Sequence, residues 1–124
     1  MRRILADTHV LLWWLADDPS LRPHHRDLLA DPDVAVWFSA VSITEIAIKQ
    51  SLGTLSAPEG AAETLIEEGF SALPLAPEHA AALATLPWHH RDPFDRMLIA
   101  QAQVESMTIA TVDRRFAGYE VLLA

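Results

Sequence analysis

Four acidic residues, widely separated in the chain, have the type and placement needed to hold a divalent cation. They are Asp7, Glu45, Asp95 and Asp113. Carboxylates that gather at one place repel one another and raise each other's pKa unless a cation neutralises them. Mg²⁺ prefers oxygen ligands and keeps bound water for a substrate, which is an arrangement used in phosphoryl transfer. The residues therefore point to metal-dependent chemistry on a phosphate ester.

These acids need a scaffold that brings them together. Short apolar segments rich in β-branched or aromatic residues predict buried strands at Ile4–Ala6, Val34–Phe38 and Thr108–Val112, with weaker strands at Ser71–Leu75 and Tyr119–Leu123. Between them, apolar residues recur with a helical period near residues 21–29, 43–47, 62–69 and 94–102. This alternation predicts an α/β three-layer sandwich with a mainly parallel sheet of about five strands, formed as a single domain over residues 1–124.

Prolines and short polar residues predict where helices begin. Pro58 and Pro77 are expected in the first turns of two helices, and Asp92-Pro93 is expected to supply an N-cap and the first helical residue. Ser42 and Glu45 form a Ser-x-x-Glu pattern, which predicts a capping box after the second strand. Under that interpretation Glu45 lies in the first turn of its helix.

The four acids map to one edge of the predicted sheet. Ligands of parallel α/β sheets bind beyond the carboxyl ends of the strands. Asp7 and Asp113 directly follow strands, and Glu45 and Asp95 lie near the starts of helices. Each also has a structural interpretation, as a turn residue, a cap or a partner of the helix dipole, and Asp92 is most simply an N-cap. The four together indicate a metal site more strongly than any one alone.

Composition excludes several other classes of protein. The chain has 124 residues and no cysteine, which excludes disulfide scaffolds and thiol nucleophiles. Its formal net charge of −8 argues against wrapping nucleic acid by bulk electrostatics. The longest apolar run, Val10–Ala16, is far shorter than the roughly 20 residues that cross a bilayer. The N-terminus lacks the apolar stretch of a secretory signal. We therefore expect a cytoplasmic protein that makes no membrane contact.

Histidines and tryptophans are interpreted mainly as structural. The pairs His24-His25 and His89-His90 lack the i, i+4 spacing of helical zinc ligands, so solvated or locally bonded side chains are expected. Trp88 lies beside this second pair and Arg91 in a predicted loop, where it is a candidate for stacking on a base. The other tryptophans are interpreted as core residues: Trp13, Trp14 and Trp37.

The acidic segments resemble the four signature blocks of the PIN-domain nucleases, and VapC-type toxins of prokaryotic toxin-antitoxin pairs are the most similar. The blocks are Ala6 to His9, Ser42 to Glu45, Asp92 to Ala100 and Thr111 to Phe116. The resemblance spans Ile4 to about Val121. It implies a five-stranded parallel sheet, endoribonuclease activity dependent on Mg²⁺ or Mn²⁺, frequent homodimers and inhibition by a small cognate antitoxin.

The resemblance also implies roles for individual residues. Asp7, Glu45, Asp95 and Asp113 match the acidic quartet, in which the three aspartates would hold metal and Glu45 would ligate metal or orient the attacking water. Asp92 matches a variant of the third block and has no assigned role. The expected substrate contacts are Thr8, Thr111, Arg91, Arg96 and Arg114, with Arg115 nearby. For each arginine, pairing with a surface acid is an equally good interpretation.

Other classes of protein fit the residues less well. A phosphorylated receiver domain needs a lysine after a late strand, and the only lysine, Lys49, lies in a helical pattern. A haloacid-dehalogenase-like phosphatase needs a second aspartate two positions after Asp7, where His9 stands. A non-catalytic PIN-like module that binds RNA or protein is the remaining alternative, and the presence of all four acids counts against it.

Overall fold

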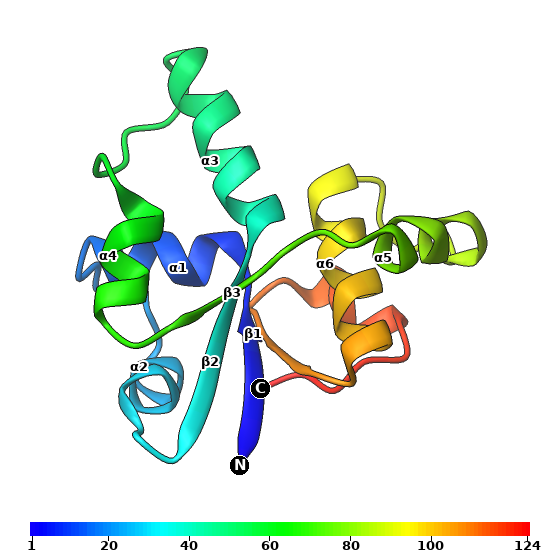
Figure 1. Ribbon diagram of the computed structural model, residues 1–124, viewed down its shortest axis with the longest axis horizontal. Coiled ribbons are helices and arrows are strands. Elements are labelled where there is room, and N and C mark those ends of the chain that lie inside the picture. Colours follow the sequence, from blue (N-terminus) through cyan, green and yellow to red (C-terminus); the bar gives the residue numbers. More distant parts are fainter.

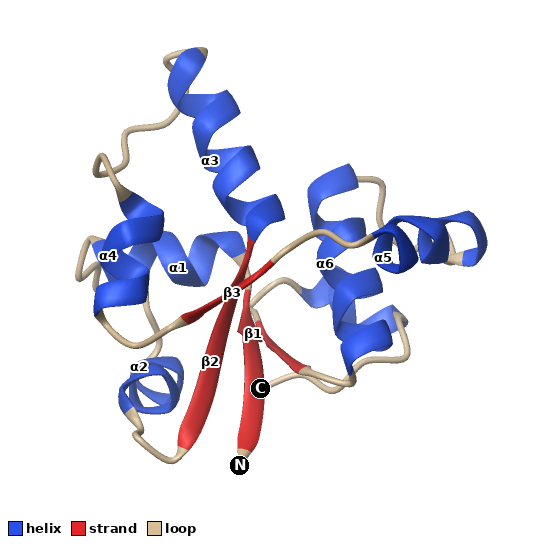
Figure 2. Ribbon diagram, viewed as in Figure 1, coloured by secondary structure: helices blue, strands red, loops and turns tan.

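A parallel sheet forms the middle layer of the protein. The computed structural model describes residues 1–124, with strands β1 (Arg2–Ala6), β2 (Val34–Ser39), β3 (Ser71–Leu73) and β4 (Thr108–Ala110). Their order is β3-β2-β1-β4, and all three pairings are parallel (Figures 1 and 2). The α/β prediction is confirmed, and β1 and β2 lie at the centre of the sheet.

The fifth strand expected at Tyr119–Leu123 is reduced to one bridge. Leu123 pairs in parallel with Ile109, beside backbone hydrogen bonds of 2.9 Å from Ile109 N–H to Leu122 and from Ala124 N–H to Ile109. After β4 the chain turns through a short 3-10 helix at Arg114–Gly118, so only its last residues reach the sheet edge. The sheet therefore has four full strands.

Helices cover both faces of the sheet. On one face lie α1 (Thr8–Leu15), α2 (Pro23–Ala30) and α4 (Ala61–Glu67), and on the other lie α5 (Pro77–Ala82), a 3-10 turn (Leu83–Thr85) and α6 (Pro93–Glu105). Helix α3 (Ala40–Ser51) continues from the end of β2 and projects beyond the sheet (Figure 1). None of these helices combines the length and apolar character that a bilayer crossing requires.

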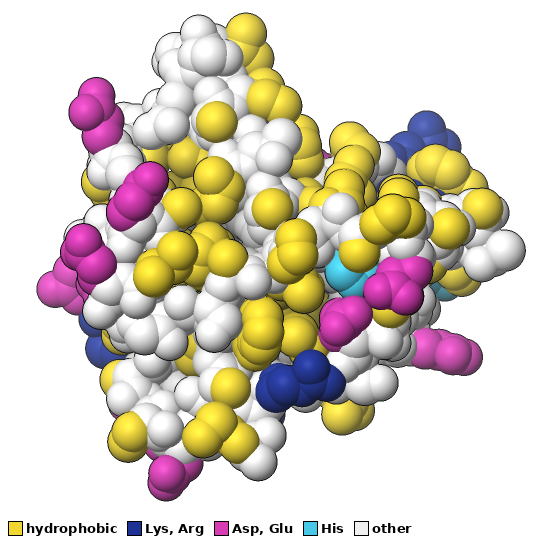
Figure 3. Space-filling view, in the orientation of Figure 1, with side chains coloured by type: hydrophobic (Ala, Val, Ile, Leu, Met, Phe, Trp, Pro, Cys, Tyr) yellow, Lys and Arg dark blue, Asp and Glu magenta, His cyan; other side chains and the backbone are white.

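The face of the molecule drawn in Figure 3 has an apolar centre. Hydrophobic side chains gather there over α3 and the centre, while Asp and Glu side chains lie along the left side and again to the right of the centre. Exposed apolar residues near α3 and α4 include Ile48, Leu52 and Ile66. The centre of this face is therefore apolar although the chain has a net charge of −8.

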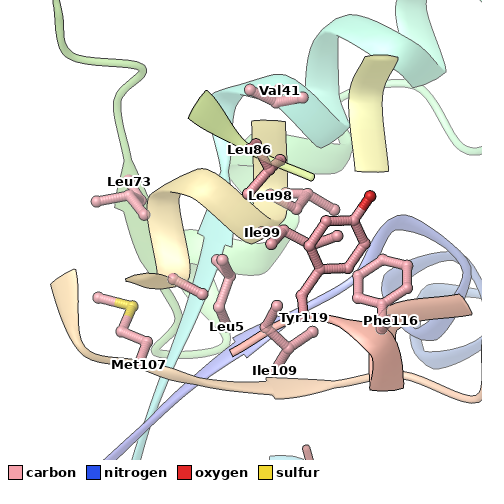
Figure 4. Close-up of a cluster of buried hydrophobic side chains, with 11 residues drawn as sticks. Leu5, Val41, Leu73, Leu86, Leu98, Ile99, Met107, Ile109, Phe116 and Tyr119 are labelled. Atoms are coloured by element: carbon pink, nitrogen blue, oxygen red, sulfur yellow. The ribbon is translucent and has the colours of Figure 1, made fainter. Parts of the chain in front are cut away.

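Two hydrophobic cores hold the sheet from its two sides. Side chains alternate along β1, so Leu5 packs with Leu98 and Ile99 of α6 (Figure 4), while Ala6 packs with Val10 and Leu11 of α1. This alternation follows from the two-residue period of a strand. All of these residues are fully buried. Packing on both faces fixes the end of β1, and with it the residue that follows.

The capping box predicted for Ser42 and Glu45 is wrong. Helix α3 begins at Ala40, and its N-cap is Ser39, whose Oγ accepts the N–H of Val41 at 2.9 Å. Ser42 therefore lies inside the first turn, and Glu45 lies in the second turn. Ser39 is the N-cap because β2 extends one residue beyond its last apolar residue and ends at Ser39. Glu45 loses its structural explanation as a cap.

Other predicted helix boundaries have mixed outcomes. Pro77 and the Asp92 N-cap are confirmed as helix starts. Pro58 instead lies in the loop before α4. That helix begins after Gly60, which has a left-handed conformation with a φ of 70°. The same helix ends before Gly69, whose φ of 93° suits a turn and not a helix. The proline pattern failed because the glycine lies closer to the apolar residues of the helix.

Candidate active site

Asp7 lies directly after β1, at the carboxyl edge of the sheet, and is 4% exposed. Its carboxylate caps α1 by accepting the N–H of Val10 at 2.9 Å, and the Thr111 hydroxyl donates to its other oxygen. Burial raises the pKa of Asp7, although both hydrogen bonds oppose the shift. A cation bound nearby would stabilise the ionised form of this carboxylate, which burial makes unfavourable.

Thr111 joins the ends of two neighbouring strands. Its Oγ1 donates to Asp7 and accepts the N–H of Asp113 at 3.0 Å. Asp113 in turn caps the 3-10 helix by accepting the N–H of Arg115 at 2.9 Å, and it also forms an ion pair with that guanidinium at 2.9 Å. The hydrogen bond from Arg115 lowers the pKa of Asp113. Asp113 therefore has a capping role, and its backbone is joined to Asp7 through the Thr111 hydroxyl.

A buried histidine, His90, lies between two of the acids. Its Nε2 is 2.8 Å from Asp95 Oδ2 and 3.6 Å from Asp113 Oδ2. Its Nδ1 accepts the N–H of Asp92 at 3.2 Å, which puts the ring proton on Nε2 in a neutral tautomer that donates to Asp95. His90 is 3% exposed, so it is locally bonded and not solvated. The sequence pattern missed its contact with the acids, because an adjacent histidine pair carries no spacing signal.

The ligand atoms of His90, Asp95 and Asp113 all lie within 4.8 Å of one another, close enough to surround one metal ion. A histidine that ligates metal usually donates its second ring N–H to an acceptor. In His90 that second nitrogen faces a donor instead. The geometry therefore favours the carboxylates as metal ligands. His90 instead holds the Asp95 carboxylate in its orientation.

Asp95 lies in the first turn of α6, where its N–H donates to the Asp92 carboxylate at 3.0 Å. Burial raises the pKa of Asp95 to about 6, with the Asp92 charge adding to the shift and His90 opposing it. The Asp7 charge raises it further, so the carboxylates of Asp7 and Asp95 are within electrostatic reach of each other.

Glu45 joins the site from α3. It is 5% exposed, its Oε2 accepts from Lys49 Nζ at 2.7 Å, and its buried Oε1 has no hydrogen-bond partner. The hydrogen bond with Glu45 raises the pKa of Lys49, as do the charges of Asp92 and Asp95. The structure thus brings all four predicted acids to one region. The i, i+4 spacing of Glu45 and Lys49 was the available sequence signal for this pair.

The predicted substrate contacts have different surroundings. Arg91 and Arg114 are exposed, whereas Thr8 is buried and donates to the Ser42 hydroxyl at 2.9 Å. Arg96 is 4% exposed, so it does not have the surface position expected of a phosphate contact. Its guanidinium donates to the carbonyls of Leu86, Pro87 and His90 and to the hydroxyl of Tyr119.

A cavity of about 260 Å³ adjoins the acidic region. Its polar lining is Thr8, His9, Asp18, Glu45, Lys49 and Ser56, and the other lining residues come from α1 with its C-cap and from the loop after α3. Glu45 thus borders a space with room for molecules larger than water.

Metal-free protein should become more stable as the pH falls from 7 to about 5. The raised pKa of Asp95 means that the folded state binds a proton that the unfolded state does not bind until its ordinary pKa of 3.8. Stability is therefore lost as the pH rises through about 6, by about 1 to 2 kcal/mol once the partial exposure of the carboxyl is allowed for. Denaturant melts in EDTA would measure this change.

Asp95→Asn is the matched variant for this pH effect. It should be at least as stable as the wild type at pH 7 in EDTA and should lose most of the pH dependence. Asp113→Asn is the contrasting variant, because the lowered pKa of Asp113 reports favourable contacts with Arg115 that asparagine weakens. Equal pH dependence of stability in the wild type and in Asp95→Asn would contradict the raised pKa of Asp95.

Solved structures share this fold from end to end. VapBC2 from Rickettsia felis, bound to a DNA fragment from its promoter, matches with a TM-score of 0.73 and 12% identity, covering 98% of this chain and 97% of that one. FitAcB from Neisseria gonorrhoeae matches with a TM-score of 0.63 and 21% identity, covering 97% and 95%. A toxin-antitoxin complex from Klebsiella pneumoniae matches with a TM-score of 0.65 and 18% identity, covering 98% and 96%.

Sequence comparison gives the family. No curated protein matches the chain in sequence. The family model described as PIN domain matches residues 4–122, which include all four acids and every strand except the first two residues of β1. The resemblance drawn from the acidic segments is thereby confirmed, and the chain belongs to the PIN domain family.

Proposed function

We propose that this chain is a metal-dependent endoribonuclease, the toxin of a VapBC-type pair, that hydrolyses phosphodiester bonds in RNA. The observation that carries the proposal is the meeting of Asp7, Glu45, Asp95 and Asp113 at the carboxyl edge of the sheet, in a chain of the PIN domain family. Two of these carboxylates have raised pKa values, which is the electrostatic setting that a divalent cation would relieve.

The residues fit a hard divalent cation such as Mg²⁺ or Mn²⁺. Such ions bind carboxylate oxygens, and Oε1 of Glu45 is buried without a partner, as a ligand atom awaiting a cation would be. Asp7, Asp95 and Asp113 would hold the metal directly or through water. When bound, the metal would make water a stronger nucleophile and offset negative charge at the phosphate.

The chain's own residues would then perform the positioning and the proton transfer. Lys49 holds one oxygen of Glu45, so the free oxygen can ligate metal or accept the proton of the attacking water. The Thr111 hydroxyl fixes the Asp7 carboxylate. Arg91 and Arg114 are exposed and would contact flanking phosphates. Because water and not the ribose 2′-hydroxyl would attack, no cyclic phosphate would form, and with the 3′-oxygen as the leaving group cleavage would leave a 5′-phosphate and a 3′-hydroxyl.

The proposal extends to partners and location. A small cognate antitoxin, a homodimer and a cytoplasmic site of action are its further parts. The fold match with a toxin-antitoxin complex supports the antitoxin. The exposed Ile48 and Leu52 of the α3 region offer apolar surface that association between protein chains could bury.

The deciding experiment is a cleavage assay. Purified chain, freed of any antitoxin, is incubated with total RNA in Mg²⁺, in Mn²⁺ and in EDTA, and the new ends are mapped. Cleavage with either metal and none in EDTA is the expected result. RNA binding without cleavage under every condition would favour the non-catalytic binding module instead.

His90→Ala should weaken metal binding about 10- to 100-fold, because the variant removes the hydrogen bond that orients Asp95. Mn²⁺ binding measured by calorimetry, and the Mg²⁺ concentration for half-maximal cleavage, would both report the loss. His90→Gln keeps a side-chain N–H donor and should recover part of the affinity.

His79→Ala is the matched control for this variant. His79 is equally buried, accepts the N–H of Ala76 at its Nδ1 and contacts Glu105 through its Nε2 at 3.0 Å, but it lies away from the four acids on α5. Because His79 lies in a separate group of possible ligands with Glu78 and Glu105, its loss should cost stability without changing the Mg²⁺ concentration for half-maximal cleavage. Equal metal affinities in His90→Ala and wild type would show that Asp95 needs no such support.

A further inference from the structure

We infer that Trp88 is a stacking platform for an unpaired RNA base next to the cleavage site, an inference that rests on the proposed action on RNA. Trp88 is 75% exposed, which is unusual for so large an apolar side chain. It lies in the loop before α6, two residues from His90. Its one aromatic contact is with the Arg96 guanidinium, which leaves most of the ring surface exposed.

The indole is held in place from beneath. The guanidinium carbon of Arg96 lies 3.7 Å from the ring centroid, within the range of a cation–π contact. Arg96 is itself fixed by hydrogen bonds to backbone on both sides of Trp88, at Leu86, Pro87 and His90. One face of the ring is therefore covered by a rigid cation, and the opposite face is open to solvent.

The surroundings of the ring suit an anionic chain that carries bases. A shallow hollow of about 250 Å³ beside Trp88 is lined by Leu83, Trp88, Arg91, Pro93, Arg96 and Met97. Two of the nine basic residues of the chain line it and none of the seventeen acidic ones does, in a protein with a net charge of −8. This local reversal of charge favours a phosphate-bearing ligand over an acidic peptide.

The platform is continuous with the candidate active site. The loop that carries Trp88 goes on to His90 and Asp92, and then to Asp95 in the first turn of α6. A base stacked on Trp88 would place its phosphate near the exposed Arg91. The RNA strand would then continue toward the four acids. Stacking needs a base that is free of a duplex, so the substrate class is unpaired RNA. Affinity from stacking would also explain how an acidic protein binds RNA.

The test measures RNA binding without cleavage. Asp7→Asn chain in Mg²⁺ is titrated with a short fluorescein-labelled oligoadenylate, followed by anisotropy at several salt concentrations. Adding Trp88→Ala should weaken binding about 10-fold or more, as expected for one lost base stack, and Trp88→Tyr should restore most of it. Leu122→Ala, at an equally exposed apolar residue, is the control and should change nothing.

Salt dependence separates stacking from charge. Trp88→Ala should leave the slope of log affinity against log salt unchanged, whereas Arg91→Gln should reduce that slope by about 0.7, the value for one lost phosphate contact on a single strand. Equal affinity in the Trp88→Ala chain, equal loss for duplex and single-stranded RNA, or a change in oligomeric state with RNA affinity intact would each overturn the inference. Cleavage by the wild type is assayed apart, so a failed nuclease and a failed platform give different results.

Discussion

Asp7→Asn protein should cleave RNA at less than about a thousandth of the wild-type rate in saturating Mg²⁺. Asparagine keeps the shape of the side chain, and its Oδ1 can still accept the Val10 N–H, so the cap of α1 survives, whereas its amide NH2 replaces the oxygen that accepts from Thr111. What is lost is the negative charge at the centre of the acidic region, on which metal affinity and water activation depend. Single-turnover cleavage of a defined RNA would measure the rate.

Two further measurements define this result. Thermal melts in EDTA should find Asp7→Asn at least as stable as the wild type, because a buried carboxylate with a raised pKa has been removed. Production of the wild-type chain alone should arrest growth, and production of Asp7→Asn should not. Full activity in the purified variant would remove Asp7 from the site, and equal growth would favour the binding module.

Glu45→Gln should lower the cleavage rate by a factor on the order of 10² or more, since glutamine can neither take the proton of the attacking water nor hold metal as a carboxylate does. The absence of a capping box makes the test cleaner than the sequence suggested. No helix start depends on this side chain, so the fold should be unaffected apart from the weakened contact with Lys49.

Lys49→Gln is the partner control for Glu45→Gln. It breaks the same ion pair and leaves the carboxylate in place, so it should retain more activity than Glu45→Gln. If the two variants lose activity equally, the ion pair and not the carboxylate matters. If neither loses activity, Glu45 is outside the machinery and the site has three acids.

The four observed strands and the positions of the four acids could be predicted because they depend on local patterns. Apolar segments flanked by polar residues located β1 and β2, and parallel pairing then required Asp7 and Asp113 to meet at one edge. The start of α3 was misplaced because Ser39 and Ser42 are equally good caps in sequence. Only the length of β2, which depends on its pairing with β1 and β3, decides between them.

Residues whose roles depend on distant contacts could not be predicted. Arg96 belongs to a helix with an apolar face, yet its guanidinium is buried by carbonyls of a preceding loop that has no regular pattern. The contacts of His90 with Asp95 and Asp113 depend on the loop conformation, which hydrogen bonds with Arg96 and Tyr119 hold in place. The roles of side chains that connect loops to the site can therefore be recognised only in the three-dimensional structure.

The single lysine of the chain has a practical consequence. Lys49 Nζ is hydrogen-bonded to Glu45, and no other residue of the sequence carries a side-chain amine. Amine-reactive dyes, crosslinkers and coupling surfaces therefore have one side-chain target, and it lies among the acids. Protein immobilised or labelled through that amine would have its candidate active site blocked. In the free protein, the rate of Lys49 acylation would report how often the ion pair between Lys49 and Glu45 opens.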